Sequence, residues 1–457
     1  MELLEFALTS PLSLVMQLAP VPLEPILVEA GAYRLGNLPD VTLDELEVVG
    51  TPGAAADPFR ALQTFPGLQN VGEGAGLFVR GGDVSETRVL LDGATVLSPF
   101  RLDGDRSVSF GPFDPFLLRG INFSAGGFGA EYGDALSAVA DLETIDRPEA
   151  RQLGLTASIG GAVTGTYTNT DLLMRLNGRR PEFDVVPRSD DLSGGFQWAY
   201  RDGGSLKTFG MRQTDEIGVR IDDPGYSGVY RSDGGAGLVI VSGLEGFGSL
   251  GLSWGLATSG SRKSEDFGAF RLARADRLTQ AHAKVEVPVS GGFSLAGGAE
   301  VEHRSADLAG AVAVASHDNA PDAPKTIFSS CESGTRLAGF GEIELQPSNA
   351  LRLLLGARAD HSSFTGRVTG DPRISATWRA AEYLTFTAAW GVFHQVPDPL
   401  LFEPTLGDPV LPSMSARHVI GGITYDNSAR FIRAEAYHMA GASVRGDGQG
   451  RGSAWGL

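Results

Sequence analysis

The chain has 457 residues, more than one ordinary domain requires, and 42% of them are hydrophobic, which excludes a disordered protein. Its formal net charge of -18 excludes the basic footprint that a nucleic-acid partner requires. The 62 glycines, which are unfavourable inside helices, predict a mainly β fold. The single cysteine excludes an internal disulfide, and no apolar run is long enough for a transmembrane helix.

The N-terminal part of the chain predicts little regular structure. Residues 1–42 show no clear periodicity, and we expect an extension or linker without a convincing export signal, because no positive region precedes the apolar run. The run "LDELEVVGTPG" (Leu43–Gly53) predicts a short strand. Residues 57–70 predict one short helix, since Asp57 can cap it and Pro58 suits its first turn.

The stretch from Leu77 to Thr144 predicts a small α+β domain with short elements. Leu77–Val79 and Thr87–Leu91 are strand-like, and Asp92-Gly93 after the second is a strong hairpin signal. Residues 117–144 predict another strand, a glycine cluster and a final strand.

From about residue 150 onward the sequence alternates. Segments of about ten residues, separated by short polar turns, add up to about fourteen strands. In "LTFTAAWGVFHQ", one face is apolar and the other is small and mostly polar. The apolar face holds Leu384, Phe386, Ala388, Trp390 and Val392. This pattern is typical of a transmembrane β-barrel, with residues 180–191, 315–334 and 395–413 as loops on one side. A soluble β-sandwich, a propeller and a solenoid are the alternatives, and the absence of a fixed repeat counts against the last two.

The two parts together resemble the TonB-dependent outer-membrane receptors, in which a plug domain sits inside a barrel. The resemblance rests on "LFVRGG", "ETRVLLDGATV" and "LLRGINFSAGGFGAEYGDALSAVADLET", and it extends from about residue 44 to the end. The residues in the places of the plug motifs are Arg80, Gly81, Asp92, Gly93, Arg119, Gly120, Tyr132 and Gly133. The resemblance implies a plug over 43–148 and a barrel over 149–457. It also suggests that Arg80, Arg119 and Glu131 pair with charges of the barrel wall, although a solvated role is equally compatible with the sequence.

The segment "LDELEVV" is similar to the TonB box of that family. Its residues are Leu43, Asp44, Glu45, Leu46, Glu47, Val48 and Val49. The resemblance implies an extended segment that a periplasmic energy transducer captures by strand addition. The alternative is that these residues form the first strand of the plug.

The expected dimensions of the two parts disagree. A plug of about 95 residues has a diameter of ~32 Å, whereas fourteen tilted strands close into a barrel of only ~28 Å. A barrel of the 22-strand type, ~44 Å across, holds such a plug. We therefore expect an incomplete barrel that lacks its C-terminal strands and does not insert stably, because lipid does not tolerate open sheet edges.

No pattern in the sequence predicts an enzyme. The histidines are not at metal-ligand spacing and no nucleotide or hydrolase motif occurs, so we expect no metal and no cofactor. The candidate ligand-binding residues are Phe100, Arg101 and Asp103, because an aromatic and a cation suit an anionic iron chelate or a sugar.

The resemblance implies a function and a location. It implies energised uptake of siderophore-iron, cobalamin or an oligosaccharide across the outer membrane of a Gram-negative type of cell. A TonB-type transducer and outer-membrane lipid are the implied partners. The alternative function is a surface-exposed, β-rich glycan-binding protein without transport.

Overall fold

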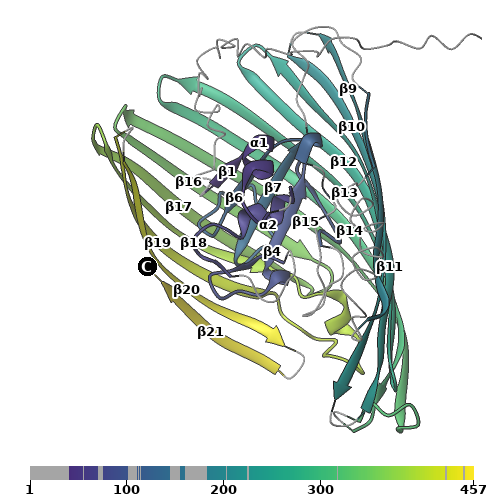
Figure 1. Cartoon of the computed structure of the whole chain (residues 1–457). Helices are drawn as coiled ribbons and strands as arrows, with labels where there is room; N and C mark the ends of the chain where they lie inside the picture. The colour runs from purple at the N-terminus through teal and green to yellow at the C-terminus, as the bar shows by residue number, and fades with distance from the viewer. Residues whose placement is uncertain are drawn as a thin grey trace, which may run out of the picture. The chain divides into compact units, whose positions relative to one another are not determined.

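The computed structural model contains two domains of very different construction (Figure 1). It describes residues 41–54, 56–69, 76–100, 111, 113, 115–144, 155–159, 183–201, 203–223, 226–315, 318–427, 430–445 and 448–456. The first domain, here called the plug, extends to residue 144 and consists of short elements. The second, here called the wall, is one large antiparallel sheet.

The plug is built on a five-stranded mixed sheet. Its strands, in spatial order, are β1 (Val41–Leu43), β6 (Leu118–Ser124), β7 (Ala138–Thr144), β4 (Thr87–Leu91) and β5 (Ala94–Thr95). Only β4 and β7 are parallel, and the other neighbours are antiparallel. The remaining plug elements are α1 (Glu45–Gly50), α2 (Pro58–Leu62), β2 (Leu68–Gln69), β3 (Phe78–Val79), η1 (Val84–Glu86) and η2 (Pro115–Leu117).

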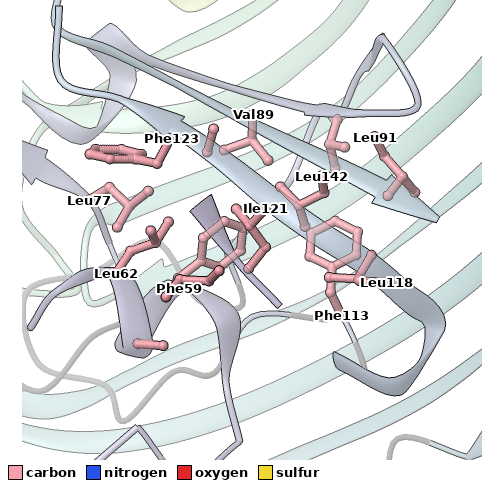
Figure 2. Close-up of a cluster of buried hydrophobic side chains, with 14 of the residues drawn as sticks. Phe59, Leu62, Leu77, Val89, Leu91, Phe113, Leu118, Ile121, Phe123 and Leu142 are labelled. Atoms are coloured by element: carbon pink, nitrogen blue, oxygen red, sulfur yellow. The ribbon is translucent and has the colours of Figure 1, made fainter. Parts of the chain in front are cut away.

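One hydrophobic core holds the plug together. Figure 2 shows Phe59 and Leu62 of α2 beside Ile121 and Phe123 of β6, and all four side chains are fully or almost fully buried. Every residue of β4 and of β7 is buried. Strands buried on both faces read as continuous rather than alternating apolar runs, and this accounts for "VLL" in β4 and "AVA" in β7.

Helix α2 begins as the sequence predicts. The carboxylate of Asp57 accepts hydrogen bonds from the backbone N–H of Phe59 at 2.8 Å and of Arg60 at 3.0 Å, and Pro58 occupies the first turn. Burial raises the pKa of the Asp57 carboxyl, and these backbone N–H groups oppose the shift. The helix ends at Leu62, earlier than expected.

The prediction of a strand over Leu43–Gly53 is wrong beyond Leu43, because residues Glu45–Gly50 form helix α1. Asp44 accepts a hydrogen bond from the Glu47 N–H at 2.7 Å, and the Glu47 carboxylate accepts one from the Asp44 N–H at 3.0 Å. This capping box satisfies two free donors of the first turn, and Val48 is buried against the plug core. Local capping and burial therefore outweigh the β propensity of the two valines.

The hairpin predicted at Asp92-Gly93 is confirmed. Asp92 and Gly93 have φ values of 47° and 79°, which suit the turn that joins β4 to β5. The Asp92 carboxylate also accepts hydrogen bonds from the backbone N–H of Thr144 at 3.0 Å and from its hydroxyl at 2.6 Å. The turn thereby fastens the end of β7 to the end of β4.

The wall is a 14-stranded sheet in which each strand pairs with its neighbour in sequence. Its first seven strands are β8 (Leu155–Ile159), β9 (Phe183–Arg201), β10 (Gly204–Asp223), β11 (Tyr226–Phe247), β12 (Leu250–Phe267), β13 (Phe270–Ser290) and β14 (Phe293–Ala313). The other seven are β15 (Lys325–Ser348), β16 (Leu351–Ser362), β17 (Arg367–Ala381), β18 (Leu384–Gln395), β19 (Met414–Asp426), β20 (Phe431–Arg445) and β21 (Gly448–Gly456). These described strands confirm the predicted mainly β, antiparallel architecture.

Most of the described wall strands are longer than the expected ten residues. β11 has 22 residues and β15 has 24. Loops predicted at 180–191 and 315–334 are wrong in large part, because β9 and β15 begin inside them. The loop predicted at 395–413 is confirmed; it joins β18 to β19 and contains the short helix η3 (Pro399–Phe402).

Candidate functional site

The two faces of the wall differ in chemistry. Along β18, Phe386 and Trp390 point to the outer face and are 37% and 42% exposed, whereas Gly391 and Phe393 are buried on the inner face. The face assignment made from the alternation is thereby confirmed. The inner face is the one that contacts the plug, since the ring of Phe393 packs against Phe128 with centroids 4.4 Å apart.

The apolar character of the outer face ends along one line. Thr258, Thr279, His303 and Thr335 are paired in register across the consecutive strands β12 to β15. The Nδ1 atom of His303 lies 3.0 Å from the hydroxyl of Thr335. Two residues away along each strand, toward the turns that join β11 to β12, β13 to β14 and β15 to β16, the same face carries apolar side chains. These are Leu256, Ala281, Val301 and Leu337. The long strands thus combine an apolar segment with a polar extension.

Arg88 of β4 is the centre of the contact between plug and wall. Its Nη2 atom pairs with Glu300 and, at 2.6 Å, with Glu302, both on the inner face of β14. Its Nη1 atom donates to the backbone carbonyl of Gly133 at 2.6 Å. Only 4% of the Arg88 side chain is exposed. A charge buried to this degree needs partners on every side, and the wall supplies two of them.

Further wall residues complete this ionic network. Arg336 of β15 pairs with Glu300 at 2.8 Å and with Asp360 of β16 at 2.6 Å. Arg358 of β16 pairs with Glu300 and donates to the carbonyl of Glu131 at 2.9 Å. Together with Arg88 and Glu302, the network contains three arginines and three carboxylates, so that its formal charges balance.

The glycine-rich segment before β7 binds a second part of the wall. Arg373 of β17 donates to the carbonyls of Gly129 and, at 2.6 Å, Tyr132. The backbone N–H of Ala130 donates to Glu342 of β15. Gly133 has no room for a side chain, because the guanidinium of Arg358 lies where a Cβ atom would be. This close approach explains the glycine at that motif position.

Other plug-motif residues have specific contacts too. Arg80 pairs with Glu435 of β20, and its guanidinium lies 4.6 Å from the ring centroid of Tyr437. Glu131 pairs with Lys284 of β13. Arg119 differs, because its half-exposed side chain lies 3.7 Å from Glu143 of the plug itself.

The remaining motif residues are explained by backbone conformation, by contacts within the plug or by close approach to the wall. Gly81 has a φ of 84°, and a Cβ atom on Gly120 would lie 3.2 Å from the carbonyl of Leu43. The hydroxyl of Tyr132 donates to Asp141 of β7 at 2.9 Å. A Cβ atom on Gly93 would lie 2.8 Å from the Nε2 atom of His282 on β13, so the hairpin tip touches the wall.

The loop between β18 and β19 joins the inner face of the wall at Asp398. Arg274 of β13 binds this carboxylate with both Nη atoms, at 2.8 and 2.9 Å, and Arg304 of β14 binds it at 3.2 Å. Burial favours the neutral acid, but Arg304 and Arg274 outweigh it and hold the pKa of Asp398 well below its usual range. Asp398 also accepts a hydrogen bond from the Leu400 N–H at 2.9 Å, which caps η3.

The three candidate ligand-binding residues are only partly described. Phe100 is buried in the plug core, where its ring lies 4.9 Å from that of Phe59. Arg101 and Asp103 lie outside the described residues. A ligand-binding role for the three stays a prediction.

The TonB-box-like residues Leu43 to Val49 are folded onto the plug. Leu43 pairs with Ile121 of β6, and Asp44 to Val49 belong to the cap and body of α1. The alternative of a first plug strand is therefore right for Leu43 and wrong for Asp44 to Val49, and capture of the segment by a transducer stays a prediction.

Glu300, Glu302, Arg336, Arg358 and Arg373 were not singled out from the sequence. The run "AEVEHRS" does carry a signal, because its alternation places Glu300, Glu302 and Arg304 on one face of a strand. Charges on the inner face of a barrel strand need partners, which here belong to the plug and to neighbouring strands.

The described residues offer neither a cluster of metal ligands nor a membrane-spanning helix. No group of histidine, cysteine and acidic side chains within that part of the chain is arranged to hold a metal ion. None of the described helices is both long and apolar enough to cross a membrane.

The chain matches two family models. Residues 41–139 match the TonB-dependent receptor plug domain, and residues 127–440 match the TonB-dependent receptor-like β-barrel. The first match starts before Leu43 and therefore includes the TonB-box-like segment. A search of curated protein sequences found no match.

Several solved structures share the fold. A mutant of the ferric enterobactin receptor PfeA from Pseudomonas aeruginosa is 14% identical, with a TM-score of 0.60 over 88% of this chain and 70% of that one. The siderophore receptor PirA from the same organism is 13% identical, with a TM-score of 0.57 over 88% of this chain and 74% of that one. The alcaligin receptor FauA from Bordetella pertussis is 13% identical, with a TM-score of 0.57 over 88% and 72%. With the barrel model matched over more than half of its length, this chain belongs to the family of TonB-dependent receptors.

Proposed function

We propose that this protein is an outer-membrane receptor that takes up an iron–siderophore complex when an energy transducer displaces its plug. The observation that carries the proposal is the buried network around Arg88, in which a plug side chain completes the charges of the inner wall. The names of the similar solved structures, which are siderophore receptors, support a siderophore over cobalamin or an oligosaccharide. The family assignment does not favour a glycan-binding protein without transport.

The outer face of the wall supports a location in the outer membrane. Leu256, Val301 and Leu337 belong to an apolar segment that ends at the polar line from Thr258 to Thr335. An apolar band of this kind is what a strand needs to face lipid. The polar extensions beyond the line then lie on the outer side of the membrane, with the loop 395–413.

The partner that supplies the energy is proposed to be a TonB-type periplasmic protein. The segment Leu43–Val49 is the proposed point of capture, and it is held to the plug by weak attachments. β1 pairs with β6 over only three residues, Val41 to Leu43, and of the helix α1 only Val48 is buried. Pulling on this segment unfolds α1 and strips β1 from β6, which transmits force to the plug sheet.

The ligand is proposed to contact the plug near residues 100–103. Phe100 closes the plug core, while Arg101 and Asp103 follow it in the chain. A cation next to a carboxylate suits a chelate that exposes both anionic and hydroxyl oxygens.

Uptake of radioactive iron tests the proposal. A Gram-negative host that lacks its own iron receptors receives this protein and is offered ⁵⁵Fe as ferric citrate, a trihydroxamate chelate or a tricatecholate chelate. We expect uptake of at least one chelate that disappears when the host's TonB-type transducer is deleted. Equal uptake with and without the transducer, or none from any chelate while labelled cobalamin enters, would contradict it.

A further inference from the structure

The two arginines that bind the carboxylate of Asp398 are arranged in a way that also suits an anionic ligand. Two nitrogens of Arg274 bind its two oxygens at 2.8 and 2.9 Å, and Arg304 adds a contact at 3.2 Å. A parallel pair of N–H···O bonds is the arrangement with which arginine recognises carboxylates and similar oxyanions. Asp398 comes from a loop, whereas both arginines come from the rigid wall.

The charges of the site depend on that loop. The wall contributes Arg274, Arg304 and one carboxylate, Asp276, which accepts a hydrogen bond from Arg304 at 2.9 Å and pairs with Arg274. With Asp398 in place, two positive and two negative groups balance. Without Asp398, Arg274, Arg304 and Asp276 together keep one excess positive charge. The Asp398 side chain is 38% exposed, so water and solutes reach the site.

We propose that Asp398 is an internal substitute for a carboxylate, or an equivalent anionic group, of the transported ligand. An arriving ligand anion takes the place of Asp398 on Arg274 and Arg304, and the loop between β18 and β19 leaves the wall. This inference rests on the proposed function and adds to it the chemical class of the ligand.

The loop is also connected to the plug. At its start, the backbone N–H of Val396 donates to Asp134 at 2.8 Å, and the Gln395 side chain donates to the Ser85 carbonyl at 2.7 Å. At its other side, Leu400 packs on a cluster with Leu308 and Phe328 of the wall. Displacement of Asp398 therefore loosens a segment that touches plug and wall. A ligand shifts this loop only by binding the open form more tightly, and the freed arginines provide that difference.

The test compares two loop variants of the full-length protein, purified in detergent. Asp398→Asn removes the negative charge but keeps an oxygen that accepts from the Leu400 N–H. The matched control is Glu403→Gln in the same loop, where the carboxylate accepts from the backbone N–H of Thr405 at 2.7 Å and Leu406 at 2.9 Å. The probes are ferric citrate, iron-free citrate and a neutral ferric trihydroxamate, each measured by calorimetry.

We expect Asp398→Asn to bind ferric citrate and citrate roughly tenfold more tightly than the unmodified protein, since one competing unit charge is removed next to two arginines. Glu403→Gln leaves binding unchanged, the trihydroxamate shows no gain, and the double variant Arg274→Gln with Asp398→Asn loses the gain. Equal citrate binding by Asp398→Asn and Glu403→Gln, including no binding by either, overturns the proposal. A gain that survives Arg274→Gln, or that the trihydroxamate shares, also overturns it. If citrate binding changes as expected while no ⁵⁵Fe chelate enters cells, the anion site stands and the proposed uptake fails.

Discussion

The plug buries its hydrophobic side chains in a core, whereas the wall exposes many of its hydrophobic side chains on its outer face. In the plug, β7 is buried over all seven residues and packs into a hydrophobic core that also includes Phe209 and Ile240 of the wall. In the wall, β18 exposes Phe386 and Trp390 outward and turns Thr387, Gly391 and Phe393 inward. The same residue types therefore stabilise the plug by packing with each other and suit the wall to an apolar environment.

The comparison explains why the contact between the two domains is rich in charge. Where it meets the plug, the inner face of the wall carries Glu300, Glu302 and Arg336 as well as buried apolar side chains such as Phe209 and Ile240. Apolar contacts occur as well, as between Phe128 and Phe393. Water can replace the polar contacts when the plug moves, whereas the apolar contacts with the wall have no such replacement.

The largest expected effect concerns the charged contact. Arg88→Met leaves Glu300 and Glu302 buried with one cation fewer, and we expect the free energy of plug detachment to fall by about 3–5 kcal/mol. Urea-dependent access of a protease to the plug measures this. Adding Glu302→Gln to Arg88→Met restores part of the loss. An unchanged urea midpoint for Arg88→Met would show that the network does not hold the plug.

A pair of leucines tests the difference between the two kinds of hydrophobic face. Leu142→Ala in the fully buried core of the plug should reduce the unfolding free energy by about 2–5 kcal/mol. Leu337→Ala on the outer face of the wall, where the leucine is 52% exposed, should change it by no more than about 0.5 kcal/mol in detergent. Equal losses for both would contradict the assignment of faces.

The edge of the apolar band can be located with arginines. Leu337→Arg places a charge inside the band and should make insertion into lipid vesicles less favourable by up to about 2–4 kcal/mol, depending on depth. Thr335→Arg, two residues along the same face and on the polar line, should have an effect near zero. The readout is the fraction of protein that becomes resistant to protease after addition of vesicles. Equal failure of both variants would place the edge elsewhere.

The smallest effect is the response of the loop to pH. The pKa of Asp398 is lowered in the folded protein, so its attachment to Arg274 and Arg304 contributes above the unfolded value of about 3.9. The contribution is lost as the pH falls through the lower, folded pKa. Hydrogen exchange at the Leu400 amide, corrected for its intrinsic rate, should be constant from pH 8 to pH 5 and increase only below about pH 4. If the exchange rate increased between pH 7 and pH 5, a titrating group other than Asp398 would be holding the loop.

The sequence predicts features of the plug that depend on local geometry. The Asp92-Gly93 hairpin and the cap at Asp57 require particular residue types at particular positions, and both occur as expected. The helix α1 was missed because the two valines of "ELEVVG" favour a strand, while the Asp44–Glu47 capping box and the burial of Val48 decide for a helix.

Features that depend on distant parts of the chain are less predictable. Alternation assigns Glu300 and Glu302 to one face, but it does not reveal that this face meets Arg88, more than two hundred residues earlier. The extra length of β15 was missed for a related reason, since its polar outer residues, from Ser329 to Thr335, resemble a loop in sequence.

The position of the plug against the inner face of the wall is the central claim, and a disulfide tests it most directly. A Cβ atom on Gly356 of β16 would lie 3.0 Å from that of Ala130, so a shift of about half an ångström gives disulfide geometry. In a Cys331→Ala background, Ala130→Cys with Gly356→Cys should form a disulfide under mild oxidation in intact outer membranes. Ala130→Cys with Ala357→Cys should not, because Ala357 is the next residue but points to the outer face. Cross-linking of neither pair, or of both equally, would contradict the account.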